Sequence, residues 1–383
     1  MDEFTEKMVV HFIEDLSPLS GGVATVVSMF CRELPTSNVR HTIICNKASN
    51  VDVLDDVDVN VFIAKERSFG WGYSKEMVDF ISKISLRPNT IFHVHGVWKA
   101  IHFFAVKIAS KNNVPCVLTT HAMLNPWFWN GQGIMKRAKK YIYWMIFARY
   151  FRKVDLVHAI TSEEQDILKI LFPNVNIVRL PNTISMRASE NSSETFLSPQ
   201  RYFLFIGRIN PQKGLDVLVR AYNSSGLKES FRLLIVGPTD DEEYWQSVCK
   251  YINDNDLNDR ITYLGSKFGA EKDTIISEAW VCTVPSRVEV IGMVNLETAS
   301  LRCPSITSFE TGLHDWEDGG GLLVMAGSDT SCSEALKRAA DWSLEERLSR
   351  GDKSYDLVDQ RYNIKKIKKR WNTVYENLSS VVR

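Results

Sequence analysis

Two glutamates, Glu289 and Glu297, are separated by seven residues and lie on either side of Gly292. The apolar run 280–284 comes just before them and is typical of a buried strand. A helix that opens near Gly292 would direct its free amides and the positive end of its dipole at the preceding loop, where a phosphate group binds well. Glu297 could then accept hydrogen bonds from ribose hydroxyls, and Glu289 could contact a sugar on the far phosphate. Taken alone, the pair is equally compatible with two solvated surface glutamates.

A second run, 201–218, supplies positive charge. Its apolar strand ends at Gly207, Arg208 and Lys213 follow, and a helical pattern begins at about Leu215. A planar guanidinium and a mobile ammonium suit the several oxygens of a diphosphate. Either cation alone is compatible with an ordinary surface residue. Two of them at the end of a strand, facing another anion site, favour a phosphate-binding loop.

Two adjacent glycines, Gly21 and Gly22, follow the first apolar run and precede another helical pattern. Glycines let the backbone approach a ligand closely, and the amides after them form an anion-favouring helix end. A plain tight turn is the alternative. The chain has no GxGxxG run and no P-loop lysine motif, which weakens dinucleotide-binding and NTPase interpretations.

Histidines stand at the ends of two further apolar runs. His93 and His95 end one of them, and His121 ends another. Zinc is one possible ligand, but no cysteine or carboxylate completes a ligand spacing nearby, so we expect no metal site. His95 could shape an acceptor pocket. His93, His11 and His158 are expected to be hydrogen-bonded core residues.

Short apolar runs alternate with helical patterns in both halves of the chain. In the first half, strands are expected at 8–13, 41–45, 59–64, 90–94, 116–120, 156–160 and 177–180. In the second half, they are expected at 202–206, 231–236, 261–264, 280–284, 304–307 and 321–324. This alternation predicts an α/β protein with two doubly wound, Rossmann-like parallel sheets, and ligands of such sheets bind at the carboxyl ends of the strands.

Domain boundaries follow from a composition shift. The window 185–194 is polar and small, and it precedes a fresh strand, so we place a linker at 185–200. The first domain then covers 1–184 and the second covers 201–360. The segment 361–383 carries apolar residues at helical spacing among lysines and is expected to form an amphipathic helix.

Composition limits the classes of function. The chain has 383 residues, 44% of them apolar, which is enough for two globular domains. Its 46 basic and 46 acidic residues cancel, so no global field favours nucleic acid. Seven scattered cysteines without a CxxC pair suit reduced thiols in a cytoplasm. The start lacks the pattern of a secretion signal and no apolar run approaches the ~20 residues that span a bilayer, so we expect a cytoplasmic protein, at most peripherally attached to a membrane.

Aromatic and basic residues interleave between Leu124 and Lys153, beginning with Trp127. Such a stretch could lie against the anionic inner leaflet of a membrane, where lipid-linked acceptors reside. The alternative is a core-packed helix with solvated cations on its outer side.

The run 207–216 and the Glu289-x7-Glu297 motif resemble the signature of retaining glycosyltransferases of family 4, which have the GT-B fold. The resemblance extends to 21–24 and 180–182. It implies transfer of a sugar, with retention, from a nucleotide diphosphate sugar to a saccharide or lipid-linked saccharide in polysaccharide or O-antigen-type biosynthesis. It also implies that no metal is needed, that 1–184 binds the acceptor and 201–360 the donor, and that the last helix crosses back to the first domain.

The resemblance also implies roles for single residues. The catalytic candidates are His121, Glu289, Arg208 and Lys213. The nucleotide-sugar-binding candidates are Gly21, Gly22, Arg208, Lys213, Glu289, Gly292, Met293, Val294 and Glu297. The acceptor candidates are His95 and Trp127. The sequence departs from the family pattern at Val290, Ala122 and Thr183, where glycine is frequent. A GT-B nucleotide-sugar epimerase and an inactive nucleotide-sugar-binding partner subunit are the alternatives.

Overall fold

The chain folds into two compact units, each with its own sheet. The computed structural model describes residues 7–17, 21–36, 38–48, 59–63, 71–125, 134–187 and 199–379. Unit 1 comprises Met1–Thr183 and Ile364–Arg383, and unit 2 comprises Ile184–Asn363. Most of the linker expected at 185–200 lies outside the described residues.

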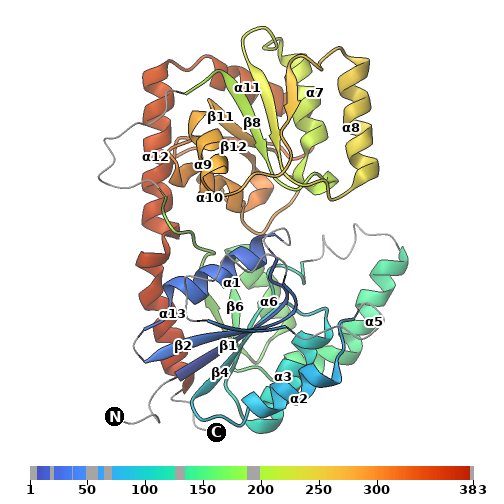
Figure 1. Cartoon of the computed structure of the whole chain (residues 1–383), viewed down its shortest axis with the longest axis vertical. Coiled ribbons are helices and arrows are strands. Elements are labelled where there is room, and N and C mark those ends of the chain that lie inside the picture. Colours follow the sequence, from blue (N-terminus) through green and yellow to red (C-terminus); the bar gives the residue numbers. More distant parts are fainter. Residues whose placement is uncertain are drawn as a thin grey trace. The chain divides into compact units, whose positions relative to one another are not determined.

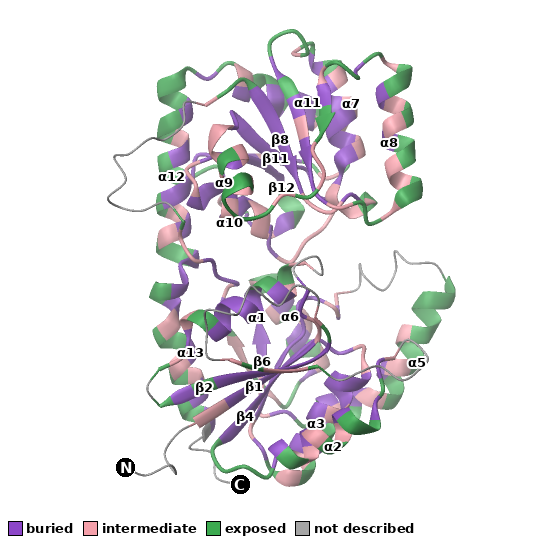
Figure 2. Cartoon of the chain, viewed as in Figure 1, coloured by how far each residue is buried: buried purple, intermediate pink, exposed green. Residues whose placement is uncertain are grey.

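Unit 1 contains a seven-stranded sheet in which every pair of neighbours is parallel, in the order β3-β2-β1-β4-β5-β6-β7 (Figure 1). The strands are β1 (Lys7–Asp15), β2 (Val39–Lys47), β3 (Asn60–Ile63), β4 (Thr90–His95), β5 (Cys116–Thr119), β6 (Leu156–Ala159) and β7 (Asn176–Arg179). Helices cover both faces of a parallel sheet, which is why its central strands are continuously buried. Figure 2 shows this burial along the strands of both units.

The described helices of unit 1 include one from the far end of the chain. They are α1 (Gly22–Glu33), α2 (Lys75–Ile84), α3 (Ala100–Asn112), α5 (Ile134–Phe151), α6 (Ser162–Leu171) and α13 (Ile364–Ser379). The apolar stripe of α13 places Trp371 and Tyr375 in the core of this unit, where the Trp371 ring lies 4.9 Å from that of Phe30. No described helix has the length and hydrophobicity that a membrane crossing requires.

Unit 2 repeats this architecture with a six-stranded parallel sheet in the order β10-β9-β8-β11-β12-β13. The strands are β8 (Tyr202–Ile206), β9 (Arg232–Val236), β10 (Ile261–Tyr263), β11 (Val281–Val284), β12 (Ser305–Ser308) and β13 (Leu322–Val324). The α-helices are α7 (Leu215–Ser225), α8 (Glu242–Asp254), α9 (Gly269–Glu278), α10 (Met293–Ser300), α11 (Asp329–Ala340) and α12 (Leu344–Tyr362), and the short 3₁₀ helices are η3 (Pro211–Lys213) and η4 (Phe309–Thr311). The predicted α/β class with two doubly wound sheets is confirmed.

Strand order reverses once in each sheet, between β1 and β4 in unit 1 and between β8 and β11 in unit 2. Loops diverge to opposite faces at such a switch point, and ligands bind there, beyond the carboxyl ends of the strands. In unit 2, the loops after β8 and β11 are the two that the motifs occupy.

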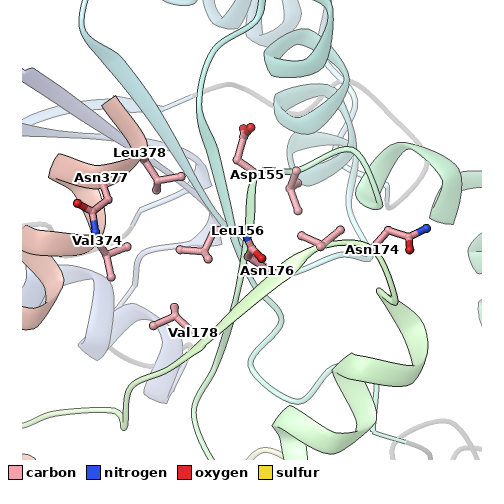
Figure 3. A pocket seen from close by; sticks show the side chains of 10 residues that line it. Asp155, Leu156, Asn174, Asn176, Val178, Val374, Asn377 and Leu378 are labelled. Carbon is pink, nitrogen blue, oxygen red and sulfur yellow. The ribbon is translucent and has the colours of Figure 1, made fainter. Parts of the chain in front are cut away.

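A hollow of about 550 Å³ lies elsewhere in unit 1, between β6, β7 and α13 (Figure 3). Leu156 and Asn176, the first residues of β6 and β7, line it together with Val374 and Leu378. It therefore lies at the amino ends of these parallel strands, the edge opposite to the one where ligands of such sheets bind.

Candidate anion and sugar site

Two glycines allow neighbouring loops at the carboxyl ends of the unit 2 strands to approach each other. Gly214 has φ +71°, and a Cβ there would lie 2.2 Å from the carbonyl oxygen of Pro285. Gly237 has φ +147°, and a Cβ there would lie 1.9 Å from the carbonyl oxygen of Gly207. Only glycine fits these positions, because both the backbone conformation and the contact exclude a side chain. Gly214 thus permits close contact between residues 207–216, which we call the β8 loop, and 285–289, which we call the β11 loop. Gly237, which follows β9, permits a similar approach to the start of the β8 loop.

Hydrogen bonds join these two loops along their length. The backbone N–H of Arg287 donates to Gln212 O at 2.7 Å, and Gln212 Nε2 donates to Val288 O at 2.9 Å. The Arg287 guanidinium donates to both carboxylate oxygens of Asp216, at 2.9 and 2.8 Å, and Tyr244 Oη donates to Asp216 Oδ1 at 2.6 Å. Burial raises the pKa of Asp216, but the hydrogen bonds from Arg287 and Tyr244 outweigh it and hold the pKa below its usual range.

The joined loops bring three of the candidate residues to one place. Lys213 Nζ lies 2.8 Å from Glu289 Oε1, and only 13% and 10% of these side chains are exposed. Ser286 Oγ donates to the same carboxylate oxygen at 2.5 Å. Arg208 is more open, with 38% of its side chain exposed, and its Nη1 lies 3.3 Å from Asp240 Oδ2. The β8 loop thus carries a more exposed guanidinium and the ammonium group of a more buried pair, whose carboxylate comes from the β11 loop.

The β11 loop leads into α10, as the motif predicted. Gly292 is its N-cap and makes no side-chain cap, and Met293 and Val294 are its first two residues. A Cβ at Gly292 would lie 2.3 Å from Asn295 Nδ2, so the glycine is needed for close packing. The first amides of a helix lack partners within it and carry the positive end of its dipole, which favours an anion.

Glu297, the second glutamate of the motif, has a partner that the sequence did not reveal. Lys272 of α9 lies 2.5 Å from Glu297 Oε2, and both side chains are largely buried. The lysine lies 25 residues upstream on another helix, and no local spacing connects the two.

The candidates of unit 1 lie on separate loops. Gly21 is the N-cap of α1 with φ +101°, and Gly22 is the first residue of this helix. His121 and Ala122 follow β5 in the left-handed region, with φ +49° and +53°. Trp127 lies outside the described residues. Left-handed conformation costs an ordinary residue about 1–2 kcal/mol, so the surroundings must hold the turn at His121 and Ala122.

Glu164 of α6 holds this turn. Its Oε1 accepts hydrogen bonds from Thr120 Oγ1 and the Ala122 N–H, both at 2.7 Å, and its Oε2 accepts from the Ile160 N–H at 2.8 Å. The carboxyl group is buried, which raises its pKa against the opposing effect of these hydrogen bonds. A glutamate in the first turn of a helix is ordinary in a sequence, so this positioning residue was not predicted.

Behind His121 lies a chain of buried imidazoles. His95 Nδ1 is 3.1 Å from His121 Nε2, His11 Nδ1 is 2.9 Å from His95 Nε2, and His41 Nδ1 is 2.8 Å from His11 Nε2. His93 and His158 are also buried and hydrogen-bonded, and the expectation of core roles for His11, His93 and His158 is confirmed. His95 is 1% exposed, so it touches His121 instead of forming an open pocket wall itself.

Two sets of side chains in this region have the donor types of a metal site. They are His11, His93 and His95, and His11, Cys31 and His41, with ligand atoms within 4.8 Å of one another in each set. The fold brings Cys31 of α1 beside histidines of β1 and β2, which no sequence spacing indicated. Except for His41 Nε2, the imidazole nitrogens of these sets are already paired with one another, with His121 or with hydroxyl groups. Burial raises the pKa of the Cys31 thiol.

The two doubly wound units define a protein of the GT-B fold. Residues 20–187 match the model of Glycosyltransferase Family 4, and residues 187–354 match that of Glycosyl transferases group 1. The chain belongs to the family 4 glycosyltransferases, as the resemblance predicted.

The named relatives have low sequence identity to this chain. An uncharacterised glycosyltransferase of Methanocaldococcus jannaschii is 24% identical over 57% of this chain and 56% of its own length. The O-antigen chain mannosyltransferase of Salmonella typhimurium is 23% identical over 68% of this chain and 74% of its own length. The chain thus aligns with little more than half of the first of these relatives.

Solved structures share the fold over nearly the whole chain. Sucrose-phosphate synthase from Thermosynechococcus elongatus has a TM-score of 0.76 at 17% identity and covers 98% of this chain and 100% of its own. Anabaena HepE, solved in complex with UDP-glucose, has a TM-score of 0.76 at 13% identity, with coverages of 98% and 100%.

The contact between Arg287 and Asp216 can be tested by Arg287→Lys. A lysine cannot make the two parallel hydrogen bonds, so we expect the free energy of unfolding to fall by about 1–2 kcal/mol. Urea denaturation measures this loss. Arg260→Lys is the matched control, because Arg260 pairs with the exposed Glu229 through a single contact and should change stability by less than about 0.5 kcal/mol. Equal losses in the two variants would contradict the assignment.

The role of Glu164 can be tested by Glu164→Ala. The variant leaves one hydroxyl and two backbone N–H groups without their acceptor, at a cost of about 1–3 kcal/mol each, so we expect a loss of about 3 kcal/mol or more. Denaturant unfolding measures it. Glu163→Ala, at the exposed neighbouring position, should stay within about 1 kcal/mol of the parent. A loss no larger than that of this control would show that the turn does not depend on Glu164.

Proposed function

We propose that the protein transfers a glycosyl group, with retention, from a nucleotide diphosphate sugar to a saccharide or lipid-linked saccharide acceptor. One observation carries the proposal: the joined β8 and β11 loops hold Arg208, Lys213 and Glu289 at the switch point of unit 2, beside the N-terminus of α10. The family membership and the UDP-glucose bound by HepE support a nucleotide-sugar donor. The O-antigen mannosyltransferase supports an acceptor of the polysaccharide type.

Charge builds on the β-phosphate as the bond to the sugar breaks. Arg208, Lys213 and the amides at Met293 and Val294 are the groups proposed to stabilise it. The loop contacts hold Lys213 in advance, whereas Arg208 would leave Asp240 and the Met293 N–H would leave Ile291 O. In this proposal the fixed cations take the role that a metal ion has in other transferases. Glu297, paired with Lys272, is proposed to accept hydrogen bonds from the ribose hydroxyls.

Glu289 has a geometry that suits contact with the sugar. Within the described residues, its Oε1 accepts the hydrogen bonds from Lys213 and Ser286, and Oε2 accepts none. A carboxylate oxygen of this kind can orient a sugar hydroxyl and offset positive charge on the ring. The proposal assigns Glu289 this role and not that of a nucleophile, and the departing phosphate takes the proton of the acceptor.

We propose that α5 of unit 1, the unit expected to bind the acceptor, contacts an anionic membrane. This helix contains five basic residues and no acidic one. One of its sides packs on the core through Trp144, Ala148 and Phe151. The exposed apolar residues are Ile134, Met135, Tyr141, Ile142, Met145 and Ile146, each at least half exposed. Apolar side chains flanked by cations match the boundary between lipid tails and anionic headgroups, and we propose the inner leaflet as the partner surface.

The transfer itself can be tested with purified protein. Screening UDP, GDP and ADP sugars by thermal shift identifies the donor, because a ligand of the native state raises the melting temperature. Arg208→Ala and Lys213→Ala should then lower the rate of nucleoside diphosphate release by about a hundredfold or more, since each removes a fixed cation from the developing charge. Lys250→Ala, an exposed cation on α8, is the control and should keep the parental rate.

Three outcomes would contradict this proposal. Parental rates in either variant would remove the phosphate role of the two cations. Donor binding without any turnover would favour the inactive partner subunit. Conversion of the donor to its epimer would favour the epimerase.

Membrane contact can be tested by flotation with vesicles of anionic phospholipid. We expect binding at low salt that weakens at 0.5 M salt, because screening shortens the electrostatic range to about 4 Å. The double variant Ile142→Glu, Met145→Glu should lose binding. Ile170→Glu, which changes an exposed isoleucine of α6, should retain it. Absence of parental binding at low salt, or equal binding by both variants, would rule out this surface.

A further inference from the structure

Two hydrogen-bonded chains of side chains cross the core of unit 1, and together they contain six of the eight histidines of the protein. We call the first, His41–His11–His95–His121, the imidazole ladder. It begins on β2, passes through β1 and β4, and ends at the candidate residue beyond β5. The second chain connects Tyr375, His93, Thr119, His158 and the carbonyl of Leu180.

The positions of the protons in the second chain follow from the carbonyl group of Leu180 at its end. A carbonyl oxygen only accepts, so His158 Nε2 donates to Leu180 O at 2.7 Å. Burial lowers the pKa of His158 to about 4, so the ring is neutral near pH 7 and its Nδ1 must accept from the Thr119 hydroxyl at 2.9 Å. Thr119 Oγ1 therefore accepts from His93 Nε2 at 2.8 Å, and His93 Nδ1 accepts from the Tyr375 hydroxyl at 2.9 Å. His93 and His158 are both protonated on Nε2.

The imidazole ladder permits only two states. Burial lowers the pKa of His121 and of His41 to about 3, and it lowers the pKa values of His11 and His95 well below the usual value, so the four rings are neutral near pH 7. A neutral imidazole has one donor and one acceptor nitrogen. Since both nitrogens of His11 and His95 bond to other imidazoles, every N–H of the ladder must point in the same direction.

The far end of the ladder selects between these two states. His41 Nε2 is buried and, within the described part of the chain, has no hydrogen-bond partner. The ammonium of Lys368, which donates to Pro35 O at 3.2 Å, is near enough to lower the pKa of His41 further. A proton on His41 Nε2 would be a buried donor without an acceptor and would lie near a positive charge, so a lone pair on this atom is favoured. His41 is thus protonated on Nδ1 and donates to His11.

We propose that the ladder, oriented by Lys368, holds His121 with its proton on Nδ1 and with Nε2 accepting from His95. His121 then presents a hydrogen-bond donor to its ligand and is not a general base. His95, His11 and His41 are positioning residues. The identity of this ligand, a sugar hydroxyl or a phosphate oxygen, depends on the proposed function. The proton arrangement does not.

Reversal of this state would require all four protons to shift together. His121 can accept a proton on Nδ1 only after its present proton has moved to Nε2. That change passes through His95 and His11 and leaves on His41 Nε2 a buried N–H without an acceptor, near the Lys368 charge. The ladder therefore opposes base chemistry at His121 from a distance.

The test is histidine-selective ¹⁵N labelling of the full chain and long-range ¹H–¹⁵N spectra near pH 7, which distinguish the two neutral tautomers and the imidazolium. We expect Nδ1–H at His41, His11, His95 and His121, and Nε2–H at His93 and His158. Single substitutions of the exposed His314 and of His102 help to assign the eight signals.

Variants of α13 probe the orienting cation without touching the ladder. Lys368→Met should populate both tautomers of His121, Lys368→Arg should keep the parental spectrum, and Lys369→Met, an exposed neighbour, should leave it unchanged. An Nε2–H tautomer or an imidazolium at His121 in the parent would overturn the proposal, as would a Lys368→Met spectrum identical to the parent. Stoichiometric metal in the purified protein, by elemental analysis, would also overturn it, because metal would occupy the nitrogens. None of these readouts uses enzymatic activity, so their failure is distinct from failure of glycosyl transfer.

Discussion

The bidentate contact between Arg287 and Asp216 is the constraint on which the candidate site of unit 2 depends. Adjacent parallel strands end side by side, but nothing in a sheet requires the loops beyond them to stay together. Here the guanidinium of the β11 loop donates to both oxygens of a carboxylate at the start of α7. Two further hydrogen bonds, one to the backbone and one from the side chain of Gln212, continue the connection. Because these contacts hold the two loops together, they also keep Lys213 of one loop beside Glu289 of the other.

The same contact also keeps a carboxylate away from the anion site. Asp216 is close in sequence to Arg208 and Lys213 and would compete with phosphate for either of them. Arg287, Arg220 and Tyr244 occupy both of its oxygens instead. Electrostatic preorganisation is favoured when cations are held in place and when a competing carboxylate nearby, here Asp216, is engaged elsewhere.

Much of the fold could be predicted because periodicity and burial are local properties of a sequence. The continuous apolar runs that became β8 and β11 are typical of strands covered on both faces, and Gly292 marked the start of α10 correctly. Partners across loops were not predictable in this way. No local pattern marks Lys272 or Glu164. The role of Lys272 depends on the packing of α9 beside α10, and that of Glu164 depends on the position of α6 beside the ends of β5 and β6.

Unit 1 shows the same limit in its histidines. The i, i+2 spacing of His93 and His95 alone places both on one face of β4. Their neighbours follow only from the sheet order and register, which pair His11 with His93, His95 with Thr119, and Thr119 with His158. The sequence indicated correctly that His11, His93 and His158 were internal, but it gave no sign that the histidines formed two hydrogen-bonded chains.

The two cations of the β8 loop differ in how readily they can change partners, and this difference bears on how a donor would enter. Arg208 and Asp240 form a long contact with both side chains more than a third exposed, and such pairs contribute only about 0.2–1 kcal/mol. Lys213 and Glu289 are far less exposed, and Ser286 supports the carboxylate, so opening this pair would leave a charge largely desolvated. On the proposed function, Arg208 would exchange Asp240 for phosphate at little cost, whereas Lys213 would keep Glu289 and contact the phosphate as a bridge. The Glu289 carboxylate would then remain beside the leaving phosphate. Lys213 would orient the carboxylate and also stabilise the phosphate.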